Sequence, residues 1–199
     1  MDSSLPLAGP ADANDAHALR GDLAIWCFIL AELLVFGILF SAYAFTRANH
    51  VAEFDASQLG LDRVSGLINT VLLITGSYFV VRAVGAIERG ANRACAQWLV
   101  AGIVTGVFFT ILKLFEFAAK LDAGINMSTN SFYMFYLFLT FFHFMHVILG
   151  MVILGAIALK AWRGGYSATD CSGVETGAAY WHMVDLVWIV LFPLIYVLH

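Results

Sequence analysis

Seven ionisable side chains lie inside stretches of the sequence that are otherwise almost entirely apolar, and their types and spacing could support chemistry. They are Glu32, Lys113, Glu116, His143, His146, His182 and Asp185. An ionisable group in lipid costs several kcal/mol unless it is paired, so each is expected to face protein. Imidazoles and carboxylates ligate metals, carry protons or form hydrogen-bonded pairs, and the spacing of these residues bears on which role applies.

The first alternative is a metal or haem site. His143 and His146 in FFHFMHVILG are spaced i, i+3 and share one helix face. From adjacent turns they could share a small metal ion, but they cannot bind opposite sides of one haem. A second axial ligand would have to be His182 or His199 from another segment. The simpler interpretation is a hydrogen-bonded core network that fixes the helices and in which Glu32 meets His143 or His146 at a similar depth. The network is expected to join the first, fourth and fifth of the predicted spans through Glu32, His143, His146, His182 and Asp185.

The second alternative is an autonomous proton or ion transporter. Glu32, the histidine pair and the His182–Asp185 pair could form a proton relay. Many transporters, however, bind their ion where paired helices are interrupted, and Pro193 is the only proline in the predicted spans. Lys113 and Glu116, spaced i, i+3 in ILKLFEF, predict a structural ion pair, or an outward reach of the lysine to the lipid headgroups.

The elements that carry these residues are predicted to be membrane helices. Apolar residues make up 61% of the 199, charged residues 12%, and the mean hydropathy is +0.85. In a soluble domain, apolar residues make up roughly 45–50% and charged residues roughly 25%. After a polar N-terminal tail over residues 1–22, a single membrane domain, residues 23–199, is expected to be an all-α bundle of five spans. The spans are predicted over about 23–46, 64–87, 95–119, 131–159 and 178–198.

Basic residues predict the orientation of this bundle. Six lie in the N-terminal tail and in the loops after the second and fourth spans: Arg20, Arg82, Arg89, Arg93, Lys160 and Arg163. The other side has only Arg47, Arg63 and Lys120. The N-terminus is therefore expected in the cytoplasm and the C-terminus in the periplasm. The tail lacks the pattern of a cleaved signal peptide. The net charge of −4 and the lack of a basic patch give no support for nucleic-acid binding.

Four motifs resemble subunit III of the haem–copper oxidase superfamily in its five-helix form. They agree with the family in order and spacing from about Arg20 onward, although larger members have seven spans. The motifs are WCFILAELLVFG around Glu32, GLINTVLLITGS from Leu67 to Ser77, HFMHVILG with His143, His146, Val147 and Gly150, and the final segment with Glu175, Tyr180, Trp181, His182, Asp185 and Trp188.

The resemblance implies an accessory subunit of a terminal oxidase or nitric oxide reductase in the bacterial inner membrane. Such a subunit has no catalytic residue, no haem and no copper. It packs beside a haem-containing catalytic subunit, holds phospholipids in a cleft, and supports proton uptake and durability during turnover. The wording of the last segment is most similar to members associated with nitric oxide reductase in denitrifying bacteria, where the expected role is to promote activity or assembly.

Overall fold

Helices make up most of the described part of the chain. The computed structural model describes residues 13–167 and 171–198, with side chains from residue 23 onward. The elements are α1 (Ala13–Asn49), α2 (Val51–Gln58), α3 (Arg63–Ile87), α4 (Asn92–Asp122), α5 (Ser131–Trp162), α6 (Ser172–Phe192) and the π-helical turn η1 (Pro193–Val197). Five segments are long and apolar enough to cross a membrane: Leu23–Asn49, Arg63–Ile87, Asn92–Asp122, Ser131–Trp162 and Ser172–Val197. The predicted all-α architecture with five spanning helices is confirmed.

The helices are longer than the predicted spans. Helix α1 begins at Ala13, within the predicted tail of residues 1–22, of which residues 1–12 lie outside the described part. The last span, predicted over 178–198, corresponds to α6 together with η1. The short helix α2 has no counterpart among the predicted elements.

Capping residues and glycines set the helix ends. At the start of α3, Asp62 Oδ1 accepts hydrogen bonds from the backbone N–H groups of Val64 (3.0 Å) and Ser65 (3.2 Å). These bonds satisfy N–H groups that have no partner within the helix. Gly90 and Gly124 follow α3 and α4 with φ of 70° and 76°, a left-handed conformation that glycine adopts without steric cost.

The cap at Asp62 predicts a pH-dependent contribution to stability. Hydrogen bonds from the Ser65 side chain and backbone hold the pKa of the Asp62 carboxyl below its usual value. Because the folded pKa lies below the unfolded value of about 3.9, this stabilisation is complete above that value and is lost as the pH falls through the folded pKa. We expect Asp62→Ala to lower the free energy of unfolding by about 1 kcal/mol at neutral pH.

Thermal unfolding of the wild type and Asp62→Ala at pH 7 and at acidic pH checks this. The difference in unfolding temperature between the wild type and Asp62→Ala should become smaller as the pH is lowered. Asp62→Asn, which keeps a capping acceptor, should lose less at neutral pH. A gap of constant size across the pH range would show that the charged carboxylate is not the stabilising group.

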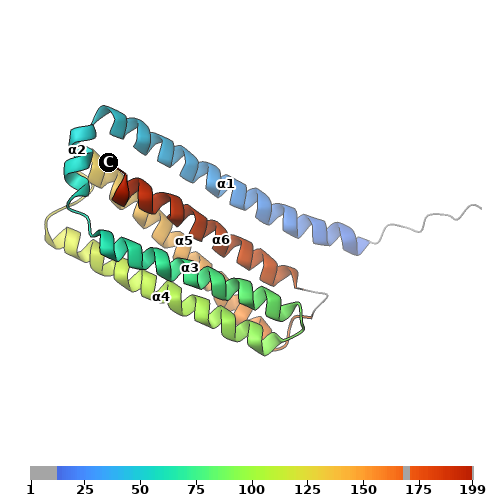
Figure 1. The fold of residues 1–199 in the computed structure, drawn as a ribbon. Coiled ribbons are helices and arrows are strands. Elements are labelled where there is room, and N and C mark those ends of the chain that lie inside the picture. The colour runs from blue at the N-terminus through green and yellow to red at the C-terminus, as the bar shows by residue number, and fades with distance from the viewer. Residues whose placement is uncertain (1–12, 168–170, 199) are drawn as a thin grey trace, which may run out of the picture.

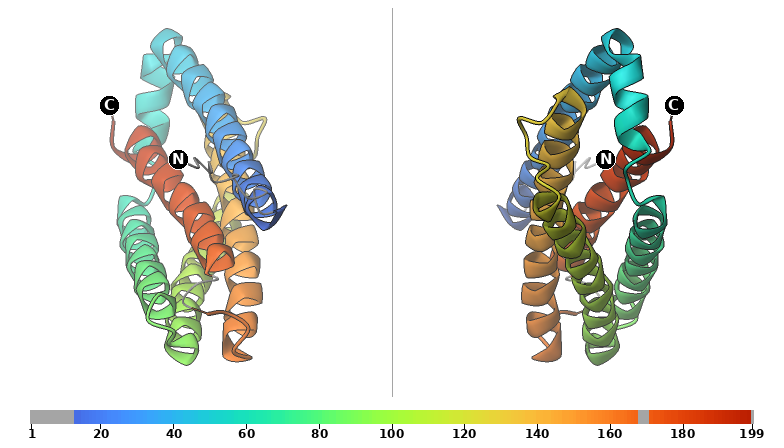
Figure 2. Two further views of the ribbon diagram at one scale, coloured as in Figure 1. Left: turned by 90° about the vertical axis from the view of Figure 1, so that its right-hand side faces the viewer. Right: turned by 90° about the vertical axis from the view of Figure 1, so that its left-hand side faces the viewer.

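The five long helices lie side by side, and α2 lies across one end of the bundle (Figure 1). Helix α3 packs on α4, α4 packs on α5, and α6 packs on both α3 and α5, whereas α1 contacts chiefly α6, α5 and α2. Views turned by 90° also have α6 between α1 and α3 (Figure 2). In the most apolar stretch of each helix, 56% of residues are buried for α6 but 11% for α1. Helix α6 is therefore central and α1 peripheral.

Trp181 of α6 is the point where four helices meet. Its side chain is 1% exposed, and a glycine from each neighbouring helix faces its ring. A Cβ atom added at Gly76 of α3, Gly106 of α4 or Gly150 of α5 would lie 3.4, 2.9 or 3.0 Å from the ring. Small residues thus let the helices approach closely around one large aromatic side chain.

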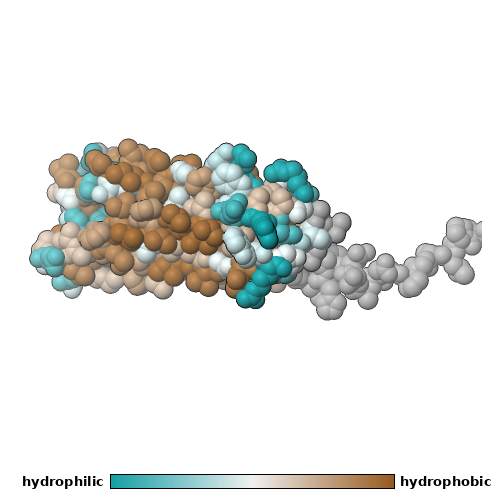
Figure 3. All heavy atoms as spheres, turned by 90° about the horizontal axis from the view of Figure 1, so that it is seen from below, coloured by the Kyte–Doolittle hydropathy of each residue, from teal (hydrophilic) through white to brown (hydrophobic). Residues whose placement is uncertain are grey.

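The outer surface is apolar in its middle and polar at its two ends. Figure 3 shows this as a brown band between teal ends. On α4 the band includes Val104, Phe108 and Phe115, which are 46%, 55% and 70% exposed. Soluble monomers rarely expose contiguous apolar patches of more than a few hundred Å². The band is the surface expected to face lipid or other membrane helices.

Candidate functional site

Glu32 and His146 join the peripheral helix α1 to α5. Glu32 Oε2 lies 3.1 Å from His146 Nε2, and the other ring nitrogen of His146, Nδ1, lies 2.8 Å from the carbonyl oxygen of Phe142. The imidazole also packs edge-on against the rings of Phe36 and Phe142, with centroids 5.3 and 4.7 Å away. The pair lies among aromatic rings, and the side chains of Glu32 and His146 are 20% and 10% exposed.

The partners of His146 determine where its hydrogens can lie. Because Nδ1 faces a carbonyl oxygen, it must carry a hydrogen and donate it. If the ring is neutral, Nε2 accepts a hydrogen bond from a protonated Glu32. If the ring is charged, Nε2 donates to the carboxylate. In both states one proton lies between Glu32 and His146, so the pair remains bonded whichever group holds it.

His143 lies one turn before His146 but bonds to a different helix. Its Nε2 donates to the carbonyl oxygen of Val184 on α6, at 3.0 Å, and its Nδ1 is buried without a hydrogen-bond partner. The ring packs against Trp188 and Phe109, at 5.1 and 5.7 Å between centroids. A neutral imidazole with its hydrogen on Nε2 fits these surroundings, because a charged ring would bury an unpaired N–H. His143 therefore joins α5 to α6.

His182 and Asp185 lie on the face of α6 that meets α3. His182 Nδ1 lies 3.2 Å from Ser77 Oγ, and Asp185 is 8% exposed, with its Oδ1 lacking a partner. Neither side chain bonds to Glu32 or to the histidines of α5. The structure thus places the polar residues of α6 against α3, which the predicted network of the first, fourth and fifth spans did not include.

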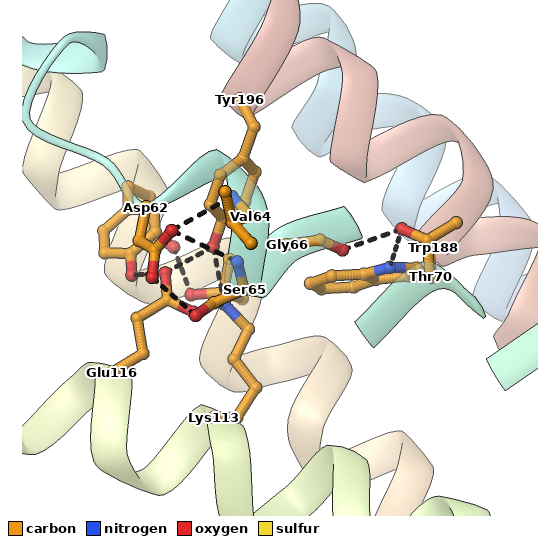
Figure 4. A network of polar contacts seen from close by, with 11 residues as sticks. Asp62, Val64, Ser65, Gly66, Thr70, Lys113, Glu116, Trp188 and Tyr196 are labelled. Carbon is orange, nitrogen blue, oxygen red and sulfur yellow. Dashed lines mark hydrogen bonds and ion pairs between the residues drawn. The ribbon is translucent and has the colours of Figure 1, made fainter. Parts of the chain in front are cut away.

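Lys113 and Glu116 form a buried polar cluster within the bundle. Lys113 is fully buried, and its Nζ donates to Glu116 Oε2 at 2.9 Å and to the hydroxyl of Tyr196 at 2.6 Å. The hydroxyls of Tyr136 and Tyr196 both donate to Glu116 Oε1, each at 2.6 Å. Figure 4 shows Lys113, Glu116 and Tyr196 meeting next to the start of α3. Lys113 does not reach the surface.

Aromatic rings surround the ammonium group of Lys113. The ring centroids of Phe117, Tyr136, Trp188 and Tyr196 lie 5.2 to 5.6 Å from Nζ. Such rings attract a cation through their negative faces. Tyr136 and Tyr196 were not among the predicted members of this cluster. Their hydroxyls within apolar segments were the available signal, because a buried tyrosine hydroxyl usually has a partner.

The chemistry of these sites is that of paired polar groups. The ring nitrogens of His143, His146 and His182 that form bonds face carbonyl oxygens, a carboxylate or a hydroxyl, and the three rings do not converge. Within residues 13–167 and 171–198, no group of three or more His, Cys, Asp or Glu side chains is placed to hold a metal ion. The fold and these contacts define a five-span membrane bundle whose buried ionisable groups join its helices to one another.

Comparison with known proteins identifies the family. The family model described as cytochrome c oxidase subunit III matches residues 14–199. Cytochrome c oxidase subunit 3 of Thermostichus vulcanus is 32% identical over 177 residues, which are 88% of this chain and 86% of that protein. Quinol oxidase subunit 3 of Bacillus subtilis is 26% identical over 176 residues, again 88% and 86%. The chain belongs to the cytochrome c oxidase subunit III family.

A third relative is a longer protein. The heme-copper oxidase subunit I+III of Aeropyrum pernix is 32% identical over 179 residues, which are 87% of this chain but 22% of that protein. Membership of the subunit III family does not favour the two alternatives raised by the sequence, an intramembrane haem or metal enzyme and an autonomous transporter.

Proposed function

We propose that this chain is a non-catalytic accessory subunit that docks onto the haem-bearing subunit I of a respiratory oxidase and stabilises it. Subunit III proteins lack redox cofactors of their own, and the haem and copper belong to subunit I. The observation that carries the proposal is the Aeropyrum relative, whose name joins subunits I and III in one chain. Two domains that are joined in one protein commonly assemble as separate chains in another.

Purification from native membranes tests this proposal. A tagged version of the full chain, extracted in mild detergent, should retain a large haem-containing partner at fixed stoichiometry. The visible spectrum of the complex should disappear when the partner is removed. A chain that purifies alone and carries its own Soret band, or that alone conducts ions in liposomes, would contradict the proposal.

The relatives indicate the membrane in which the protein lies, whereas the substrate that the complex reduces is part of the proposal. Five spanning helices and bacterial subunit III relatives indicate a multi-pass protein of the bacterial inner membrane. The relatives described above are named for cytochrome c, quinol or heme-copper oxidases, and the assignment to the nitric-oxide-reductase branch stays a prediction. Consumption of oxygen and of nitric oxide by the purified complex, with quinol or reduced cytochrome c as electron donor, distinguishes a cytochrome c oxidase, a quinol oxidase and a nitric oxide reductase.

The orientation predicted from the sequence is part of the proposal. One end of the bundle carries five exposed or half-buried basic residues, Arg82, Arg89, Arg93, Lys160 and Arg163, whereas the other end carries Arg47, Arg63 and Lys120. This asymmetry supports a cytoplasmic N-terminus and a periplasmic C-terminus. Alkaline phosphatase fused after His199 should therefore be active, since that enzyme requires the periplasm.

The Glu32–His146 pair is proposed to hold α1 in place. Helix α1 is the least buried of the spanning helices, so one partly buried hydrogen bond is a large share of its attachment. We expect Glu32→Ala to lower the free energy of unfolding by about 1–3 kcal/mol, because it leaves His146 Nε2 unpaired. Retention of this subunit by the complex should fall, while electron transfer in intact complexes continues. Subunit content and thermal unfolding of the purified complex measure both effects.

Two variants serve as controls for this experiment. Glu32→Gln keeps a hydrogen-bonding group opposite His146 and should behave nearly as the wild type. Glu88→Ala removes an exposed carboxylate at the end of α3 and should change neither measurement. Full subunit content and unchanged stability in Glu32→Ala would show that the polar pair does not hold the bundle together.

Phospholipids are the second proposed partner. The exposed apolar band of the bundle supports this, because a membrane subunit is covered by acyl chains wherever it is not covered by protein (Figure 3).

A further inference from the structure

A small cavity of mixed polarity lies between the start of α3 and the end of α4. Its volume is about 270 Å³, and its polar walls are formed by Asp62, Ser65, Glu116 and Lys120. Leu112 and Phe115 form much of its apolar wall. Figure 4 shows Asp62 and Ser65 on one side of this region and Glu116 on the other. The proposed docking onto subunit I makes no use of these residues.

The charged residues that line the cavity are Asp62, Glu116 and Lys120. Glu116 is neutralised from within the bundle by Lys113 and the two tyrosine hydroxyls. Asp62 is an exposed carboxylate that accepts hydrogen bonds from Val64 and Ser65, including one of 2.6 Å from Ser65 Oγ. A carboxylate has about four acceptor sites, and this geometry fills three of them.

Lys120 is the cation. Its Nζ donates to the carbonyl oxygen of Gly60 at 2.6 Å. An ammonium group has three donors, so Lys120 can hold a second acceptor, such as a phosphate oxygen, without giving up Gly60.

The cavity lies where two spanning segments end, which is the level expected for lipid headgroups. Asp62 comes directly before the spanning segment Arg63–Ile87, and Lys120 lies two residues before the end of Asn92–Asp122. Towards the middle of the bundle, Phe115, Phe108 and Ile68 are 70%, 55% and 46% exposed. A polar cavity with a zwitterionic rim is thus followed by an apolar strip, the order of parts in a phospholipid.

We infer that this cavity binds the headgroup of a phospholipid with a primary ammonium, of the phosphatidylethanolamine class. The phosphate lies against Lys120, the ammonium donates to Asp62, and the acyl chains follow the strip of Phe115, Phe108 and Ile68. About 270 Å³ lies just below the range of drug-sized ligand sites, roughly 300–1,000 Å³, and suits a headgroup rather than a whole lipid. The inference rests on the proposed function only in taking phospholipids as partners.

The rim also accounts for the choice among lipids. Phosphatidylglycerol has a net negative charge, and its headgroup has no positively charged group that could pair with the Asp62 carboxylate. Phosphatidylcholine is zwitterionic, but its quaternary nitrogen has no N–H to donate to the Asp62 carboxylate. A primary ammonium provides both the charge and the donor.

Lipid retention by the full-length chain tests the inference. The purified chain in non-ionic detergent is supplied with equal amounts of phosphatidylethanolamine, phosphatidylcholine and phosphatidylglycerol, and native mass spectrometry counts the lipids retained. We expect phosphatidylethanolamine to be retained about tenfold over phosphatidylglycerol, the effect of one charge-assisted hydrogen bond. Lys120→Met and Asp62→Asn should each reduce this retention by about the same factor.

Asp62→Asn keeps a capping side chain at the start of α3, so it separates binding from folding. Lys160→Met, at the opposite end of the bundle, is the matched control and should retain lipid as the wild type does. Equal retention of the three lipids by the wild type, or unchanged retention in Lys120→Met, would overturn the inference. Subunit I retained without lipid selectivity would overturn this inference alone, whereas lipid selectivity without subunit I would overturn only the proposed function.

Discussion

Replacing Glu116 by glutamine should lower the free energy of unfolding of the bundle by about 3–5 kcal/mol, the cost of removing one partner of a buried ion pair. Lys113 is fully buried, so its ammonium cannot turn to water when the carboxylate is lost. Glu116 also accepts from Tyr136 and Tyr196, and through them joins α4 to α5 and to the C-terminal turn η1. Denaturant or SDS titration of the purified chain, followed by circular dichroism, measures the loss.

A double variant separates the ion pair from the rest of the cluster. Lys113→Met/Glu116→Gln removes both charges but keeps an acceptor for the tyrosine hydroxyls, and it should recover most of the stability lost in Glu116→Gln. Glu88→Gln makes the same change at an exposed carboxylate and should remain within about 0.5 kcal/mol of the wild type. If the losses of Glu116→Gln and of Lys113→Met alone simply added in the double variant, the two side chains would not act as a pair.

Most of the fold could be predicted because a membrane span must satisfy its own backbone and must be apolar over about 20 residues. Helix α2 could not be predicted in this way. Its sequence, VAEFDASQ, is short and mixed in polarity, and tertiary contacts accompany its helical form. Phe54 is fully buried against Tyr43 and Phe132, and Gln58 Nε2 donates to the carbonyl oxygen of Ile195 at 2.9 Å.

For the polar sites, the sequence indicates which residues share a helix face but not which neighbouring helix each residue contacts. Spacing of i, i+3 indicates that His143 and His146 share a face, but a face between two helices has two neighbours. His146 meets α1 through Glu32, whereas His143 meets the backbone of α6. The sequence of one helix does not contain the depth or rotation of the next, so Ser77 as the neighbour of His182 could not be inferred.

Trp181→Ala should lower the free energy of unfolding by about 3–5 kcal/mol, the range for removing a fully buried aromatic side chain. Lipid is as apolar as leucine, so membrane helices associate mainly through close packing and hydrogen bonds. One ring contacts the glycine faces of α3, α4 and α5, and its loss opens a cavity at all three interfaces. Trp162→Ala is the matched control, because that side chain is 60% exposed, and it should change stability little.

The glycine opposite the ring provides a test in which the sign of an effect should change. In the wild type, Gly150→Ala puts a Cβ 3.0 Å from the Trp181 ring, and we expect a loss of about 1–3 kcal/mol from overpacking. In the Trp181→Ala background the same methyl group enters the cavity, so Gly150→Ala should be neutral or stabilising. Equal losses in both backgrounds would mean that another neighbour, such as the Tyr180 ring at 3.4 Å from the added Cβ, limits the space at Gly150 rather than Trp181.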